Sequence, residues 1–152
     1  MSTWFTVKVK FDRQGEDGLL TKVTEPFLVD ALSFTEAEKR TLDEVRHYST
    51  SGEIEIADIK KTKIAELVQN SDGDIWFRCK INIVTIDEDK GIERKSPQII
   101  MMQASSLKNA VDQLIAHMST TAIDYELAAV TETNILDVFE YVAPAAAPAP
   151  VQ

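Results

Sequence analysis

The chain repeats itself at a nearly constant spacing, and this repetition restricts its possible folds more than any other feature. The segment Trp4–Val9 recurs at Trp76–Ile81, a shift of 72 residues (from 4 to 76). Two further matches keep the same order, at shifts of 73 and 71: Ala31–Ala37 with Ala104–Ala110, and Glu55–Ala57 with Glu126–Ala128. Because chance matches would not keep order and spacing together, we predict two equivalent halves of about 70 residues each.

Each half has the pattern of two strands, a helix and a further strand. In the first half, apolar residues alternate with polar ones from Phe5 to Phe11, which is the period of a half-buried strand. A second strand ends near Phe27–Val29, and Ser33, three residues before Glu36, has the position of a helix N-cap. The third strand shows a step of three residues between apolar positions, from Ile56 to Ile59 and again from Leu127 to Val130. This step predicts a β-bulge in both halves.

The two helices and the short segments after the third strands complete the pattern. Ser106 is the expected N-cap of the second helix. Apolar residues at helical spacing are expected to face the core; they are Phe34, Ala37, Leu42, Val45 and Tyr48 in the first helix, and Leu107, Ala110, Ile115 and Met118 in the second. Ile64–Val68 reads as a strand that enters a hairpin over Asn70–Asp74, and Ile135–Phe139 is its counterpart.

The resulting order, ββα-ββββ-α-ββ, predicts an α+β fold made by internal duplication of a ββαβ unit, with antiparallel sheets and two helices on one face. We expect a single duplicated domain over residues 1–142, with repeats at about 4–68 and 76–139. Residues 143–152 are rich in Ala and Pro and have no apolar periodicity, so they are expected to form a disordered spacer.

Charge and cysteine content limit the classes of function. The net charge of -9 argues against a protein that coats duplex DNA through bulk positive charge. No basic region followed by an apolar stretch opens the chain, and no apolar run approaches the ~20 residues needed to cross a bilayer. The only cysteine is Cys79, so an internal disulfide is impossible. We therefore expect a cytoplasmic protein that does not bind membranes.

The residues that commonly carry catalysis lack the partners that catalysis requires. His47 and His117 lie near the ends of predicted helices, where the helix dipole favours a cation, and neither belongs to a motif. Cys79 lies on the apolar face of its strand. Asp72-Gly73-Asp74 superficially suggests a calcium loop, but the closing bidentate Glu is missing and a turn explains it better. We therefore predict a non-enzyme with no metal and no cofactor.

One predicted surface could bind a ligand. The polar side of the first strand in each half carries a tryptophan followed by cations: Trp4, Lys8 and Lys10, and Trp76, Arg78 and Lys80. An aromatic beside cations on a sheet can stack bases and neutralise phosphates, as in single-strand binders. Alternatively, both tryptophans cover a subunit interface, for example in a homodimer, or pack beneath a neighbouring loop.

Three segments of the chain carry a resemblance to a known family: Val23–Ala37, Lys60–Ile64 and Thr131–Phe139. They resemble an uncharacterised domain family found in Bacteroidetes genomes and their phages. The resemblance implies a phage or mobile-element setting and supplies neither an activity nor site residues. The strand order is also loosely similar to the Whirly and Pur-alpha single-strand-binding folds, a likeness of fold that implies nucleic-acid binding only by analogy.

The leading hypothesis from the sequence is an accessory protein that binds single-stranded nucleic acid. The alternative is a non-enzymatic protein–protein adaptor, or a phage-encoded inhibitor of a host factor. A pocket for a small molecule or nucleotide is the third hypothesis.

Overall fold

The computed structural model describes residues 3–141, which form two compact units. Unit 1 contains residues 3–62 together with 136–141, and unit 2 contains residues 63–135. The predicted tail at residues 143–152 lies outside the described residues. Each unit combines one α-helix with one four-stranded sheet, so the α+β class is confirmed.

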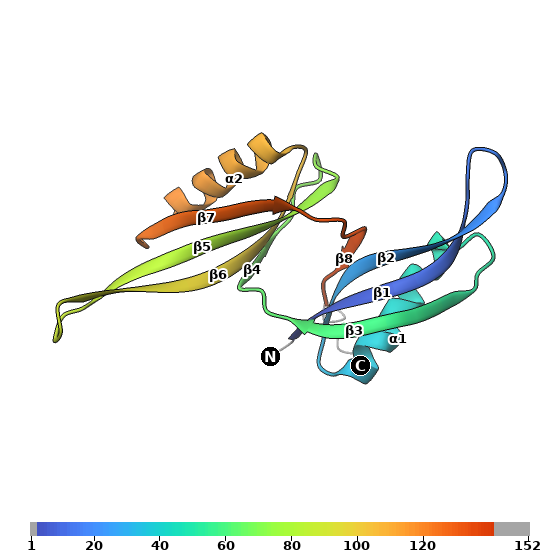
Figure 1. Ribbon diagram of the computed structural model, residues 1–152, viewed down its shortest axis with the longest axis horizontal. Helices are drawn as coiled ribbons and strands as arrows, with labels where there is room; N and C mark the ends of the chain where they lie inside the picture. Colours follow the sequence, from blue (N-terminus) through green and yellow to red (C-terminus); the bar gives the residue numbers. More distant parts are fainter. Residues whose placement is uncertain (1–2, 142–152) are drawn as a thin grey trace, which may run out of the picture. The chain divides into compact units, whose positions relative to one another are not determined.

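Unit 1 has a sheet in the order β3-β1-β2-β8 (Figure 1). Its elements are β1 (Thr3–Gln14), β2 (Leu20–Ala31), α1 (Phe34–Val45), a 3-10 turn (Arg46–Tyr48), β3 (Ile54–Thr62) and β8 (Asp137–Phe139). β1 pairs antiparallel with both β2 and β3, whereas the short β8 runs parallel to β2.

Unit 2 has the same topology, in the order β4-β6-β5-β7. Its elements are β4 (Glu66–Val68), β5 (Ile75–Asp87), β6 (Ile92–Ala104), α2 (Leu107–Ser119) and β7 (Tyr125–Glu132). The predicted hairpin over Asn70–Asp74 is wrong, because β4 pairs with β6, in parallel. β5 already has β6 and β7 as neighbours, so it has no free side for β4.

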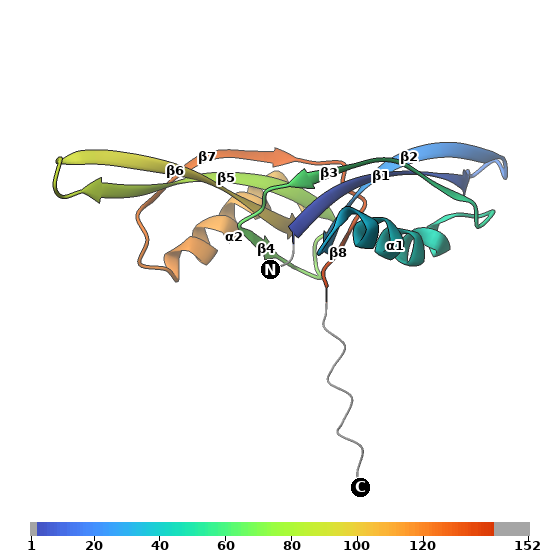
Figure 2. The same ribbon diagram turned by 90° about the horizontal axis from the view of Figure 1, so that it is seen from below.

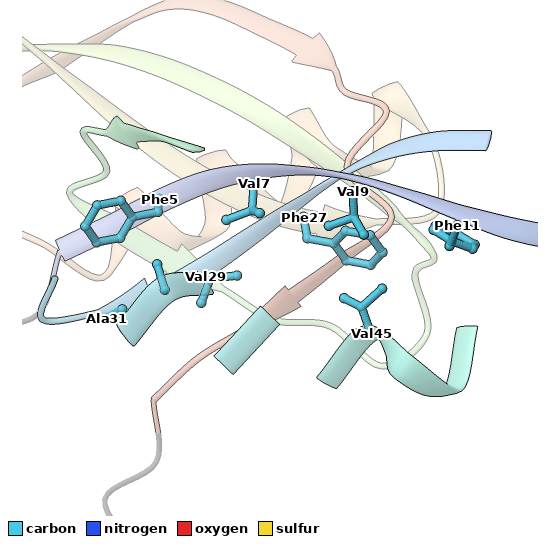
Figure 3. Packing of buried hydrophobic residues seen from close by; sticks show 9 residues of the cluster. Phe5, Val7, Val9, Phe11, Phe27, Val29, Ala31 and Val45 are labelled. Atoms are coloured by element: carbon cyan, nitrogen blue, oxygen red, sulfur yellow. The ribbon is translucent and has the colours of Figure 1, made fainter. Parts of the chain in front are cut away.

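One helix covers one face of each sheet. α1 packs against β1, β2 and β3, and α2 packs against β5, β6 and β7 (Figure 2). The odd-numbered side chains of β1 from Phe5 to Phe11 point to the helix and form the core of unit 1 with Phe27 (Figure 3). The alternation of β1 in the sequence therefore predicted its buried face correctly.

The buried stripe of each helix confirms part of the prediction: Ala37, Val45, Ala110 and Met118 are buried as expected, whereas Thr41 and Leu114 were not predicted. It consists of Ala37, Thr41 and Val45 in α1, and of Ala110, Leu114 and Met118 in α2. Phe34 and Leu107, which we expected in the core, are 48% and 54% exposed, because each is the first residue of its helix. Leu42 is half-buried, and its counterpart Ile115 is 45% exposed.

The predicted caps and bulges are confirmed in both units. The Oγ atoms of Ser33 and Ser106 accept hydrogen bonds from the backbone N of Glu36 and Asn109, both at 3.1 Å. In β3, Asp58 pairs with Lys8 and Ile56 pairs with Val9, which leaves Ala57 as the extra residue of a bulge. Ala128 is the extra residue of β7 in the same way.

Candidate functional site

The candidate residues belong to the helix-free face of each sheet, which we define as the face opposite the helix. In unit 1 this face carries the even-numbered residues of β1, and Lys8 and Lys10 are exposed on it. The strand register places Asp58 beside Lys8 and Glu55 beside Lys10. Residues directly opposite each other share a face, so each lysine has an acidic neighbour that lowers the local positive potential.

Trp4 lies at the other end of the same strand and is only half-buried. Its register neighbour on β2 is Asp30, which is buried, and the Oδ1 of Asp30 has no hydrogen-bond partner among the described residues. A carboxylate beside the ring disfavours an approaching phosphate. Lys60 lies opposite Thr6 on the same face and adds an exposed cation between Trp4 and Lys8, so the charges around the three candidate residues of unit 1 are mixed.

The candidate cations of unit 2 have uncharged neighbours, in contrast to the lysines of unit 1. Arg78 is exposed and Lys80 is half-buried on the central part of β5. The register places Met101 and Thr131 beside Arg78. Ile99 and Ala129 lie beside Lys80, so every register neighbour of these two cations is uncharged.

Farther along the helix-free face of unit 2 the charges are mixed. Asn82 lies opposite Pro97 on β6 and Glu126 on β7. Glu126 forms an ion pair with Lys95, with Nζ and Oε2 3.1 Å apart. The positive stretch of β5 therefore ends near Asn82 and comprises Arg78 and Lys80.

Trp76 does not provide the exposed ring that we expected. Its side chain is only 4% exposed. Its backbone carbonyl accepts hydrogen bonds from the N and Oγ1 of Thr133, at 3.0 and 2.7 Å, which ties the start of β5 to the segment after β7. Alternation along a strand correctly places Trp76 opposite the core, but it does not reveal whether other residues cover that face.

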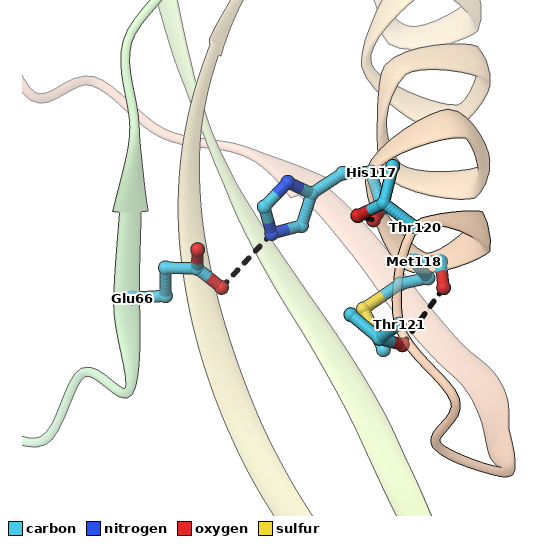
Figure 4. A network of polar contacts seen from close by, with 5 residues as sticks. All are labelled: Glu66, His117, Met118, Thr120 and Thr121. Atoms are coloured by element: carbon cyan, nitrogen blue, oxygen red, sulfur yellow. Dashed lines mark hydrogen bonds and ion pairs between the residues drawn. The ribbon is translucent and has the colours of Figure 1, made fainter.

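The remaining titratable residues of interest form local contacts. His117 Nε2 lies 2.9 Å from Glu66 Oε2, so α2 is joined to β4 (Figure 4). Burial raises the pKa of the Cys79 thiol to about 11. Burial, and secondarily the hydrogen bond to Asp137, raises the pKa of Tyr48 well above its ordinary value. Among residues 3–141, no group of three or more His, Cys, Asp or Glu could hold a metal ion.

The sequence reasoning missed a set of exposed apolar side chains at the two long hairpins. They are Leu19 and Leu20 where β1 joins β2, and Ile86 and Ile92 where β5 joins β6, all more than half exposed. The available signal was the position of these large apolar residues beside turn sequences rich in Gly and Asp.

Comparison with protein-family models identifies the family of the chain. The model of the domain of unknown function DUF4494 matches residues 3–141, which include both units. The chain belongs to the DUF4494 family. No curated protein and no solved structure matches it. Within the described part of this DUF4494 chain, no helix is long and apolar enough to cross a membrane.

Proposed function

We propose that this DUF4494 protein binds single-stranded nucleic acid on the helix-free face of unit 2. The observation that carries the proposal is the setting of Arg78 and Lys80, two cations on a central strand whose register neighbours are all uncharged. Ile99 of β6 is half-buried beside Lys80 and adds apolar surface next to the cations, whereas Met101 is buried. Cations beside an apolar surface suit a strand whose phosphates and unstacked bases are both accessible.

Within this proposal the two units contribute unequally. Lys8 and Lys10 add less to phosphate binding because Asp58 and Glu55 lie beside them. Trp4 belongs to unit 1 and is half-buried, so it is not part of the proposed surface of unit 2, whereas Trp76 is buried and supports the fold. The net charge of -9 opposes the approach of any polyanion, so binding is modest and is lost at high salt.

We further infer that the two units arose by internal duplication. Both have the same strand order, equivalent N-cap serines and equivalent bulges, with Ala57 and Ala128 at a shift of 71 residues (from 57 to 128). The phage or mobile-element setting implied by the resemblance, and a cytoplasmic place of action, belong to the same proposal.

Anisotropy of a fluorescent single-stranded oligonucleotide tests the proposal. We expect the wild type to raise the anisotropy at low ionic strength. The double variant Arg78→Ala/Lys80→Ala should bind more weakly, with a slope of log K against log salt reduced by about 1.4, or about 0.7 for each phosphate that is no longer neutralised. The control is Lys39→Ala/Lys108→Ala, which removes the same charge from exposed helix positions. An unchanged anisotropy with the wild type, or equal losses of affinity in both double variants, would refute the proposal.

The exposed apolar hairpin ends favour a protein–protein adaptor as the second candidate function. Leu20 and Ile86 are large apolar residues at the ends of the two hairpins, and both are exposed. Such residues anchor protein interfaces more often than nucleic-acid interfaces. If this function holds, a partner protein should co-purify with the wild type at constant stoichiometry. The double variant Leu20→Ser/Ile86→Ser should lose that partner. Equal recovery of the partner with both proteins would exclude this role for the hairpin ends.

A further inference from the structure

The last strand of each sheet comes from the other repeat of the sequence. β3 ends the first ββαβ pattern, yet the next strand, β4, joins the sheet of unit 2 beside β6. β7 ends the second pattern, yet β8 joins the sheet of unit 1 beside β2. Figure 1 shows β4 next to β6 and β8 next to β2. The two repeats therefore exchange their terminal strands reciprocally.

The exchanged strands occupy equivalent places and share a residue pattern. β8 pairs in parallel with Phe27–Val29, and β4 pairs in parallel with Ile100–Met102, a shift of 73 residues (from 27 to 100). β4 has the sequence Glu-Leu-Val and β8 the sequence Asp-Val-Phe. In each case an acid is followed by an aliphatic residue and a second apolar residue.

The acid of each exchanged strand is bound by a residue near the end of the local helix, from the 3-10 turn after α1 in unit 1 and from the last turn of α2 in unit 2. The Oη of Tyr48 donates a hydrogen bond of 2.5 Å to Asp137 Oδ2 in unit 1. His117 Nε2 lies 2.9 Å from Glu66 Oε2 in unit 2 (Figure 4). Charged acceptors strengthen such hydrogen bonds and make them directional, so both contacts fix the register of the incoming strand.

Phe139 and the segments that follow the two exchanged strands make further contacts. Phe139 stacks on Phe27, with ring centroids 5.6 Å apart. Beyond β8, Arg40 of α1 donates to the backbone O of Glu140 at 3.3 Å. Beyond β4, the side chain of Asn70 hydrogen-bonds to Gln113, which occupies in α2 the position that Arg40 has in α1. Each unit therefore binds an exchanged strand and a residue that follows it, Glu140 in unit 1 and Asn70 in unit 2.

We propose that unit 1 is a strand-acceptor site whose alternative ligand is the β8 segment of a second copy of the chain. The acceptor recognises an extended segment with an acid, an aliphatic residue and an aromatic residue in that order. The chain's own β8 normally fills the site because residues 133–136, which we call the tether, join it to β7 and give it a high effective concentration. A second copy exchanges β8 when the tether can no longer reach, which joins two chains reciprocally without any new interface.

Shortening the tether tests this proposal in the full chain, independently of nucleic-acid binding. Thr133 is bonded to the backbone of Trp76, and the N of Leu136 donates to the O of Pro26 at 2.9 Å, so the tether is anchored at both ends. Deletion of Asn134 and Ile135 removes up to about 7 Å of its reach. We expect this deletion to convert the protein into a dimer, measured as a doubled mass by light scattering after size-exclusion chromatography.

Two matched variants make the test specific. Deletion of Glu16 and Asp17, in the turn between β1 and β2, removes two residues but leaves the β8 tether intact, so this protein should stay monomeric. Phe139→Ala in the tether-shortened chain removes the aromatic stacking on Phe27, so its dimer should dissociate at a protein concentration at least tenfold higher. A monomeric tether-shortened protein, or a dimer that Phe139→Ala does not weaken, would overturn the proposal.

If the tether-shortened protein aggregates, refolding of the wild type tests whether β8 exchanges between copies. The wild type unfolded in urea and refolded at about millimolar concentration should yield a dimer that persists on dilution, because a swapped state is kinetically trapped. The same treatment of the full-length Phe139→Ala protein should yield less dimer. Recovery of monomer alone from the wild type would refute the exchange of β8 between copies.

Discussion

The substitution Leu114→Ala tests the placement of α2 on its sheet. Leu114 is 0% exposed and lies between Ala110 and Met118 in the buried stripe, whereas its sequence neighbour Ile115 is 45% exposed. Both residues lose three carbon atoms when they are replaced by alanine. The pair therefore compares a buried and a half-exposed position at constant chemistry and nearly constant place in the chain.

The expected magnitudes follow from burial. Removal of three fully buried carbons costs about 2.4 kcal/mol in transfer free energy, at about 0.8 kcal/mol for each. The cavity left beneath α2 adds to this, so Leu114→Ala should lower the free energy of unfolding by about 3–4 kcal/mol. Ile115→Ala should cost less than about 1 kcal/mol, because its carbons are partly hydrated already and alanine favours the helix.

Urea unfolding followed by far-UV circular dichroism measures both values. A loss of about 3 kcal/mol should also lower the Tm by more than about 10 °C, since domains of 60–100 residues shift by about 4–8 °C for each kcal/mol. Equal losses of stability for the two variants, or a larger loss for Ile115→Ala, would show that α2 is rotated about its axis relative to the stripe described above.

Three other predictions concern unit 2 and its turns. Cys79 should resist thiol reagents at pH 8 in the native protein, because it is buried and its pKa is raised to about 11; rapid labelling in native buffer would contradict this. Because the folded pKa exceeds the ordinary value of 9.0, the stability contributed by the neutral thiol is complete below pH 9 and is lost as the pH rises toward 11. The urea midpoint should decline less over that range in Cys79→Ala than in the wild type. Gly73→Ala should destabilise the protein by at least about 2 kcal/mol, because its Cβ would lie 2.4 Å from the backbone C of Ala104. Gly15→Ala is the control, because its Cβ would lie 3.0 Å from the Asp17 side chain and no closer than 3.8 Å to the backbone O of Leu19; equal Tm values for the two variants would contradict the clash. Ser106→Ala should cost about 1 kcal/mol through loss of the N-cap, and a cost above that of Leu114→Ala in the same urea assay would count against the packing described.

Local signals in the sequence predicted local structure well. The three-residue steps at Ile56 and Leu127 predicted both bulges, and Ser33 and Ser106 predicted both helix starts. These features depend on a few neighbouring residues, and the repetition of each one a second time strengthened the prediction.

The helix faces and the short strands could not be predicted in the same way. Thr41 looked polar, yet it is buried because its hydroxyl donates a 2.7 Å hydrogen bond to the carbonyl of Ala37. β4 and β8 have three residues each, which is too short for alternation to indicate a partner or a direction. Their parallel pairing depends on the edges that the longer strands leave free.

The exposure of the candidate cations was predicted better than the residues that surround them. The sequence correctly placed Lys8, Lys10 and Arg78 on exposed positions of the helix-free faces. It could not show that Asp58 would lie beside Lys8, because that neighbour comes from a strand 50 residues later (from 8 to 58) in a register set by a bulge. The burial of Trp76 likewise depends on tertiary structure.

The connectivity of the sheets also reverses the usual order of folding during synthesis, in which the N-terminal part of a chain folds first. Every strand of unit 2 lies between residues 63 and 135, so this unit is complete once that continuous stretch has emerged. The sheet of unit 1 cannot be completed until β8 (Asp137–Phe139) has been synthesised, about 75 residues after Thr62. At 5–20 residues per second this delay is roughly 4–15 s. During that interval the β2 edge, with Phe27, lacks its neighbouring strand. The N-terminal unit of the nascent chain is therefore the last to close, and it is the one most open to chaperones and to neighbouring chains on the same messenger RNA.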